Sequence, residues 1–310
     1  MIKKKSIDNQ LHDKVYSNIN PINWKFILIG IILFAVGFLV NFPIRRTIIN
    51  FSSRKLANFK ACPINYERLE LGRFLQWAKF KGPIISGSCY GQSSSNFLRL
   101  ESLNISLETI TMNPPGVKLH LKLKKNKTNL NIYPILSYPK MGLQIKDSVI
   151  DGDIVKNLTG DMFKLLGQIK INSDLIFQKN NLNSGSISIV SKNLSIPTQN
   201  IMNFLVPHLN IRDLNIKANI KGTNNIHFSS LKLGSETSPI MASFKGSIKL
   251  NSQNIRRSNL DLKGKIKFSA EFLKKFAILN IFISGKQKDS NGFYSLSLKG
   301  PMGQPKMKLD

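Results

Sequence analysis

The chain has few of the residues from which enzyme and metal sites are built. Its 310 residues include two cysteines and four histidines, and only 17 acidic residues stand against 45 lysines and arginines. No Cys-x-x-Cys pair, glycine-rich phosphate loop, His-Glu-x-x-His motif or nucleophile elbow occurs. No histidine is followed by a second ligand three or four positions later; the four are His12, His120, His208 and His227. The sequence therefore predicts no catalytic residue, no metal ligand and no cofactor, and indicates a protein that is not an enzyme.

The densest acidic segment, "KDSVIDGDIV" (residues 146–155), is a weak candidate for calcium. Only Asp151 and Asp153 fit an oxygen-rich loop together, because Asp147 lies further away in sequence. No glutamate follows at the distance at which a bidentate ligand closes a calcium loop. A turn rich in aspartate and glycine accounts for the segment better.

Two cysteines are too few for a disulfide scaffold and lack the paired spacing of a zinc site. Cys62 and Cys89 leave two alternatives. In an oxidising compartment they form one bridge across 27 positions, worth ~3 kcal/mol on the chain-entropy model. Otherwise they are two separate buried thiols.

The formal charge of +28 first suggests a nucleic-acid partner. The lysines are placed singly at alternate positions of strand-like runs, as in "GVKLHLKLKK" (residues 116–125), rather than in clusters interleaved with aromatic residues. That spacing is typical of the solvated face of a half-buried strand. We expect no nucleic acid as partner, although such a face attracts anionic lipid head groups.

One apolar segment is long enough to cross a membrane. Residues 26–44 contain no charge over 19 positions, which corresponds to ~28 Å of helix and matches the hydrocarbon thickness of a bilayer. No small-x-small cleavage site follows, so an uncleaved signal anchor is favoured over a cleaved signal peptide. The residues expected to fix this anchor are Trp24, Phe26, Ile44, Arg45 and Arg46.

The direction of insertion is not set by charge. Five lysines precede the apolar segment within residues 1–25, and five basic residues follow it within residues 45–60. Because the positive-inside rule compares charge on the two sides, it gives a tie here. The expected organisation is a tail at 1–25, the anchor at 26–44, a linker with the first elements at 45–82 and a β domain at 83–310.

The domain after the anchor is predicted to be mainly β, an extended and largely antiparallel sheet with a few short helices. Beyond Gly82 apolar and polar residues alternate with period two in short runs. Glycine, asparagine and serine separate these runs. The candidate strands are residues 98–107, 117–123, 168–177, 186–190, 209–220, 247–250, 259–262, 265–268, 294–298 and 306–309. Residues 66–82 fit a helix or a strand.

Helical patterns are scarce. Residues 153–166, 200–206 and 270–284 are the best candidates. Three short helices cover only part of the apolar face of such a sheet. We therefore expect the sheet either to fold over on itself or to form a bent groove whose uncovered part binds something apolar.

A faint repeat of the form Gly-x-Ile-x-apolar begins at Gly167, Gly185, Gly246 and Gly264. Within each pair the glycines are 18 residues apart, about the length of a strand, a turn and a returning strand. The repeat favours a long antiparallel meander. The alternative is that the pattern is simply a common way for a strand to begin.

The chain ends "SLSLKGPMGQPKMKLD", two alternating runs separated by a turn that contains Gly300 and Pro305. We expect two final strands, with Met307 and Leu309 buried and the intervening lysines in water. Such an ending either completes the sheet or leaves an edge for a partner. If it completes the sheet, loss of the last ten residues costs ~3 to 6 kcal/mol.

The last eighty residues resemble the carboxy-terminal region of the type II secretion protein N (GspN) family. The similar features are an "LG…SPI" strand from Leu233, the "KGSIKLN" strand from Lys245, the "LDLKGKIKFS" strand from Leu260, a short helix and the closing turn and strand. The resemblance extends in texture over about residues 60–310. It implies an inner-membrane anchor with residues 1–25 in the cytoplasm, a periplasmic β domain, and a non-enzymatic role through contacts with other secretion-apparatus proteins.

The same closing strand is also similar to the ending of AsmA-like and TamB-like periplasmic proteins, whose β grooves carry lipid. The two resemblances imply the same fold and differ in cargo. An interaction protein is expected to have an apolar face covered by its own chain or by a partner. A lipid conduit is expected to have a continuous open face lined by isoleucine, leucine and phenylalanine, to which acyl chains bind.

Overall fold

The computed structural model describes residues 28–33, 49–50, 56, 62–72, 76–90, 96–112, 115–158, 164–178, 181–201, 204–251, 254 and 257–309. The chain divides into two units, Met1–Ser52 and Ser53–Asp310. In the first unit residues 28–33 are helical, and no helix within the described ranges has the length and apolar character needed to span a membrane. The residues expected to fix the anchor lie outside these ranges; they are Trp24, Phe26, Ile44, Arg45 and Arg46.

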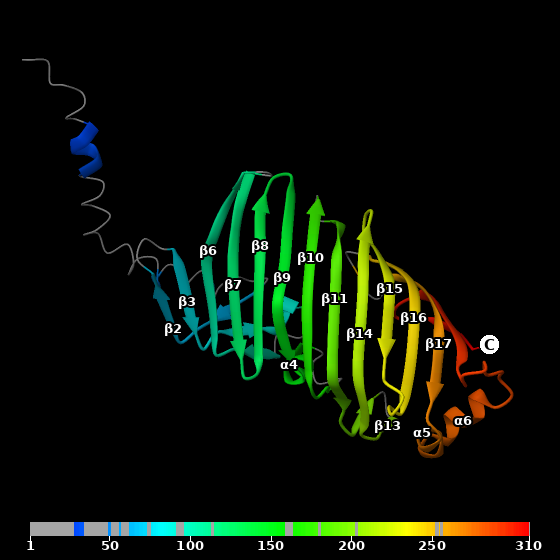
Figure 1. The fold of residues 1–310 in the computed structure, drawn as a ribbon. Coiled ribbons are helices and arrows are strands. Elements are labelled where there is room, and N and C mark those ends of the chain that lie inside the picture. The colour runs from blue at the N-terminus through cyan, green and yellow to red at the C-terminus, as the bar shows by residue number, and fades with distance from the viewer. Residues whose placement is uncertain are drawn as a thin grey trace, which may run out of the picture. The chain divides into compact units, whose positions relative to one another are not determined.

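The second unit is built on one antiparallel sheet of 14 strands (Figure 1). Each strand pairs with the next along the chain, except where smaller elements are inserted between β3 and β6 and between β11 and β14. In spatial order the strands are β2 (Arg68–Leu71), β3 (Trp77–Lys81), β6 (Ser102–Met112), β7 (Pro115–Lys125), β8 (Thr128–Ser137), β9 (Lys140–Asp151), β10 (Gln168–Gln178), β11 (Asn181–Ile196), β14 (Leu209–Lys221), β15 (Asn225–Leu233), β16 (Ile240–Lys249), β17 (Asn259–Phe268), β18 (Tyr294–Pro301) and β19 (Lys306–Leu309).

The remaining elements are short. A three-stranded sheet has the order β1-β4-β5, and β12 and β13 form a hairpin. Their bounds, with those of the helices, are β1 (Ile64–Asn65), β4 (Ile84–Ser86), η2 (Gly87–Tyr90), β5 (Phe97–Arg99), α4 (Gly152–Leu158), β12 (Gln199–Ile201), β13 (Phe204–Val206), α5 (Ala270–Lys275) and α6 (Ala277–Ile283). The predicted mainly β fold, with a large antiparallel sheet and few short helices, is confirmed.

Several strand boundaries differ from the prediction. The single strand expected at 98–107 is two, β5 and β6, which belong to different sheets. The two expected at 259–262 and 265–268 are one continuous strand, β17, and residues 66–82 form β2 and β3. The break between β5 and β6 has a local cause, since Leu100 is buried and its N–H donates to the Pro83 carbonyl at 2.9 Å.

The helix predictions were right in part. Residues 270–284 are helical but broken at Phe276. Of the helix expected at 153–166, residues 153–158 are helical in α4, and residues 164–166 are not helical. The helix predicted at 200–206 is wrong, because that segment lies in the β12–β13 hairpin, where Ile201 pairs with Phe204. The nine residues between Pro197 and Pro207 give a helix too few internal hydrogen bonds to be stable, whereas a hairpin pairs its backbone at once.

The two faces of β17 differ because apolar residues and lysines alternate along the strand. Leu260 and Leu262 are buried on one face, while Lys263 and Lys265 lie on the other. Gly264 sits among the buried positions because a Cβ there would lie 2.5 Å from the ring of Phe244. The neighbouring phenylalanine thus fills the space that the missing side chain leaves.

Two glycines of the repeat have a shared structural role. Gly185 and Gly246 adopt φ of 147° and 139°, a region that side chains rarely enter. In each case a Cβ would lie 2.1 Å from the carbonyl oxygen of an aspartate on the neighbouring strand, Asp174 or Asp261. The repeat is therefore more than a common strand beginning at these two positions, although Gly264 has no positive φ.

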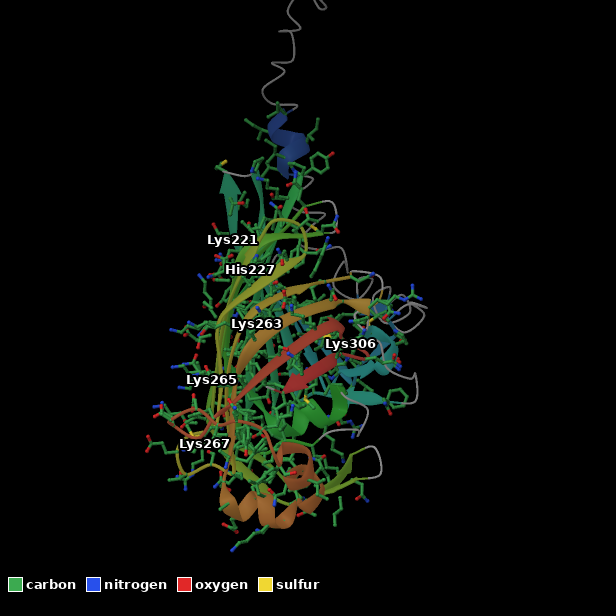
Figure 2. The ribbon with its side chains drawn as sticks, turned by 90° about the vertical axis from the view of Figure 1, so that its right-hand side faces the viewer. Lys221, His227, Lys263, Lys265, Lys267 and Lys306 are labelled. Carbon is green, nitrogen blue, oxygen red and sulfur yellow. A yellow bond between two sulfur atoms is a disulfide. The ribbon has the colours of Figure 1, made fainter. Side chains whose placement is uncertain are left out.

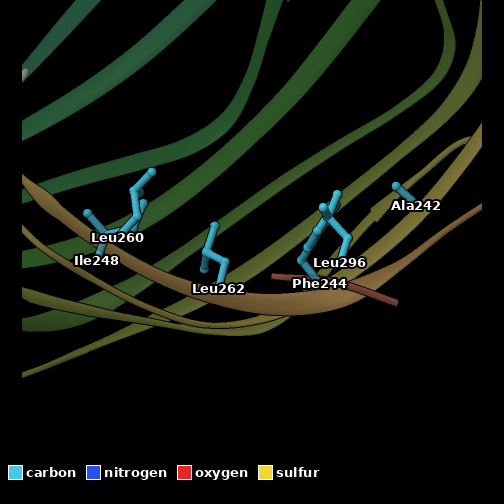
Figure 3. Close-up of a cluster of buried hydrophobic side chains, with 6 residues drawn as sticks. All are labelled: Ala242, Phe244, Ile248, Leu260, Leu262 and Leu296. Atoms are coloured by element: carbon cyan, nitrogen blue, oxygen red, sulfur yellow. The ribbon is translucent and has the colours of Figure 1, made fainter. Parts of the chain in front are cut away.

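Three clusters of buried residues in the described part of the chain lie on one face of the sheet, which we call the inner face. One cluster joins α4 and β5 to β7 and β9 through Ile154, Leu98 and Leu100. A second joins α5 to β10, β11 and β14, with Phe272 as the buried residue of the helix. The third comes from the sheet alone (Figure 3); its buried members are Ala242, Phe244, Ile248, Leu260, Leu262 and Leu296.

Candidate functional site: the inner face of the sheet

One unbroken row of cross-strand neighbours runs along the inner face through all 14 strands. Each residue pairs directly with the next, so the row needs no side chain to reach over a gap. In spatial order it is Leu71, Ala78, Ile105, Leu121, Ile132, Ile145, Ser173, Ile187, Ala218, Phe228, Gly246, Leu262, Leu298 and Met307. Except for one serine and one glycine, every member is apolar. At the usual spacing of strands the row is about 60 Å long.

Only one end of the strands is covered on this face. The covering elements contact Leu123 at the end of β7, Ile150 near the end of β9 and Leu209 at the start of β14, which the antiparallel order brings to the same edge. Figure 1 shows α4, β13, α5 and α6 along that edge. We call this the covered edge, and the opposite one, where β6 meets β7 and β8 meets β9, the open edge.

The four strands β6 to β9 have an aliphatic inner face that the described covering elements contact at Leu123 and Ile150, near the covered edge, and leave open toward the opposite edge. None of their apolar side chains is among the buried residues. Exposure increases toward the open edge, reaching 50% at Leu107 and Leu136 and 65% at Ile110. Because soluble surfaces seldom expose contiguous aliphatic patches, this region is the best candidate for a binding site.

Ser173 is the polar member of the row, in the middle of the sheet on β10. It is buried, and its Oγ has no hydrogen-bond partner. A buried hydroxyl without a partner is usually matched by water or by a ligand. Its direct neighbours, Ile145 and Ile187, are both apolar.

The outer face of the same sheet is polar and basic. Lys263, Lys265 and Lys267 alternate along β17, and Figure 2 labels them together with Lys221 of β14. The Lys265 ammonium lies 2.7 Å from Asp289, and this hydrogen bond is the main reason why the pKa of Asp289 is lowered. The structure thus bears out the placement of single lysines on a solvated strand face.

Of the remaining predicted residues, the two cysteines lie together, since a disulfide joins Cys62 to Cys89. This bond ties the start of β1 to the 3₁₀ helix η2 and so holds the three-stranded sheet that covers part of the inner face.

The closing strand lies where the sequence placed it, with Pro305 just before β19, but Gly300 lies in β18, which extends to Pro301, rather than in the turn. Leu309 packs against the third cluster as predicted. The burial expected of Met307 is wrong, because its side chain is 70% exposed. As an edge strand of four residues, β19 has no neighbour on its far side to cover that side chain.

The described histidines and acidic residues form no site. No group of three or more His, Cys, Asp or Glu within the described ranges could hold a metal ion. His120 stacks on Tyr133 at 4.5 Å and its Nε2 lies 3.3 Å from the Asn131 side chain, which accounts for it structurally. Asp151 caps the start of α4 by accepting from the Asp153 N–H at 3.4 Å, as a turn residue does.

Sequence reasoning missed the members of the row that lie on β8, β9 and β15. The missing signal was available in "NLNIYPILS" (residues 129–137), where apolar residues alternate with asparagine and tyrosine. Pro134 and the many asparagines in this stretch hid the alternation, because both residue types usually mark turns. Comparisons with protein-family models, curated proteins and solved structures found no match for this chain.

Proposed function

We propose that this protein binds the acyl chains of lipids along the inner face of its sheet. The observation that carries the proposal is the uncovered aliphatic inner face of β6–β9. Each exposed large aliphatic side chain forgoes up to about 1.5 to 3 kcal/mol that full burial would provide. An apolar ligand that lies along the row would recover part of this free energy.

The dimensions of the row suit several acyl chains side by side. One leaflet of a bilayer is about 15 Å of hydrocarbon, whereas the row is about four times as long. Burial of apolar area needs no directional group from the protein, which is consistent with the lack of polar residues in the row other than Ser173. The proposal therefore includes no catalytic residue and no cofactor.

The proposed setting rests on the sequence. Residues 26–44 anchor the chain in the bacterial inner membrane, residues 1–25 are cytoplasmic and residues 83–310 lie in the periplasm. The oxidising character of that compartment is consistent with a disulfide between Cys62 and Cys89.

The test is photo-crosslinking of the full chain with a phospholipid that carries a diazirine in one acyl chain. We expect labelled peptides from β6–β9, with labelling reduced several-fold by unlabelled phospholipid. Leu136→Asp should reduce labelling several-fold, because it places a charge on the inner face. The matched control is Ile135→Asp, the adjacent residue of the same strand on the outer face, which should leave labelling unchanged. Labelling confined to residues 26–44 would contradict the proposal.

A second proposal is an accessory role in a type II secretion apparatus through protein contacts. It is supported by the resemblance to the GspN family and by β19, an edge strand with Met307 exposed, to which a partner strand could add. A photo-crosslinking amino acid at Met307 should then capture a component of the apparatus in cells. Absence of any such crosslink, with the protein expressed and folded, would count against this role.

A further inference from the structure

The tips of two adjacent hairpins carry strongly exposed apolar side chains. Met112 ends β6 and is 86% exposed, and Tyr138 follows β8 and is 89% exposed. Both lie beside the start of β7, since Met112 pairs with Pro115, and Gly116 pairs with Ser137. Together with the exposed Ile110 and Leu136 they extend an apolar patch, and contiguous patches of this kind usually mark a contact surface.

The tips continue directly into the inner face of the sheet. Ile110 pairs with Val117, which in turn pairs with Leu136, so a second apolar row lies just behind Met112. These hairpin tips are at the open edge, opposite α4, α5 and α6 (Figure 1). Nothing in the described part of the chain separates them from the uncovered strands.

Two lysines, Lys118 near the start of β7 and Lys140 at the start of β9, lie close to the apolar tips, and Glu108 is the acidic residue of the same region. Lys140 is two positions from Tyr138 and next to Met141, and Lys118 lies 5.0 Å from the ring of Tyr133. Apolar and tyrosine side chains among lysines are typical of surfaces that enter the head-group region of an anionic bilayer. Cores of protein interfaces are instead depleted in lysine.

We propose that the β6–β7 and β8–β9 hairpin tips insert into the head-group region of an anionic phospholipid bilayer and hold the open edge of the inner face against it. This inference deepens the proposed function and rests on it, since it gives the edge by which acyl chains pass between a bilayer and the sheet. The tyrosine hydroxyl and the lysine ammonium stay at the level of the head groups, while Met112 and the Tyr138 ring enter the boundary of the acyl chains.

The test uses the full chain reconstituted in vesicles of phosphatidylcholine and phosphatidylglycerol whose acyl chains carry bromine, which quenches tryptophan. In a background of Trp24→Phe and Trp77→Phe, the reporter is Tyr138→Trp. A ring seated ~5 to 10 Å into the boundary should lose roughly half of its emission to the bromolipid. Met112→Trp is the second reporter and should behave in the same way.

The matched control is Lys127→Trp, which places the same reporter in the exposed turn between β7 and β8, at the other end of the same strands. We expect it to lose less than a tenth of its emission, about five-fold less than the tip reporters. Equal quenching at both ends, or no quenching at position 138, would overturn the inference. Quenching at the tips without acyl labelling of β6–β9 would support membrane docking and overturn the proposed acyl-chain binding. Acyl labelling of β6–β9 without quenching at the tips would support acyl-chain binding and overturn the docking.

Discussion

The strands β6–β9 and the strands β16–β18 belong to one sheet and share one alternating pattern, yet they bury their side chains very differently. Three strands, β16, β17 and β18, supply all six buried residues of the cluster in Figure 3. The four strands β6–β9 supply no buried apolar residue. The alternation sets which face a side chain takes, and the packing of its neighbours on that face decides whether it is buried.

The difference comes from close fit between neighbouring strands. In β16–β18, Phe244 fills the space above Gly264, and partly buried residues of β15 and β19 close around the cluster. In β6–β9 the row consists of Ile105, Leu121, Ile132 and Ile145, side chains of similar size, none of which is buried. One region of the sheet is thus a core, and the other is a surface with the composition of a core.

The most direct test of this difference in packing is to truncate one side chain in each region. Phe244→Ala should lower the free energy of unfolding by about 3 to 4 kcal/mol, because it leaves a cavity beside Gly264. Ile132→Ala should lower it by about 1 kcal/mol, since that side chain is half-buried and water can occupy the space. The measurement is the urea midpoint of the full chain by circular dichroism in one detergent. Equal losses would show that β6–β9 is as well packed as β16–β18.

The difference between the face that a side chain takes and its burial explains which features could be predicted from the sequence. Alternation located β7, β10, β14 and β19 and placed Lys306 and Lys308 in water, because the side of a strand that a residue takes is a local property. Burial of Met307 could not be read in this way, since it depends on whether another strand follows β19. The row along the inner face also depends on the register of every pair, which long-range pairing determines.

A second test measures how much the edge strand β19 contributes to the stability of the sheet. A chain that stops at Met302 loses Leu309, which is partly buried, and Met307, which is mostly exposed. We therefore expect a loss of about 1 to 2 kcal/mol, smaller than the estimate based on two buried side chains. The readout is again the urea midpoint, with Met307→Ser as the control that keeps the strand. A loss as large as that of Phe244→Ala would mean that β19 is an essential part of the core.

The smallest expected effect concerns the turn that leads into β18. The Asp289 carboxylate accepts hydrogen bonds from the Lys265 ammonium at 2.7 Å and from the backbone N–H groups of Asn291 and Phe293 at 3.0 and 2.9 Å. The hydrogen bond from Lys265 is the largest cause that lowers the pKa of Asp289. Because its pKa is lower in the folded chain, the charged carboxylate contributes stability above the unfolded pKa of about 3.9, and this is lost as pH falls through the folded value.

Hydrogen exchange of residues 290–294, corrected for the intrinsic rate, should therefore show protection that falls once the pH drops below about 4. Asp289→Asn should start with weaker protection and show no such fall, since an amide keeps one acceptor but has no charge to lose. The control is Asp261→Asn on β17, where the carboxylate lies 3.8 Å from the Lys299 ammonium; this substitution should leave the turn unchanged. If Asp289→Asn kept the pH dependence of the original chain, another group would hold the turn. If Asp289→Asn instead kept full protection at every pH, the packing of Tyr294, which is buried at the start of β18, would be sufficient to fix the turn.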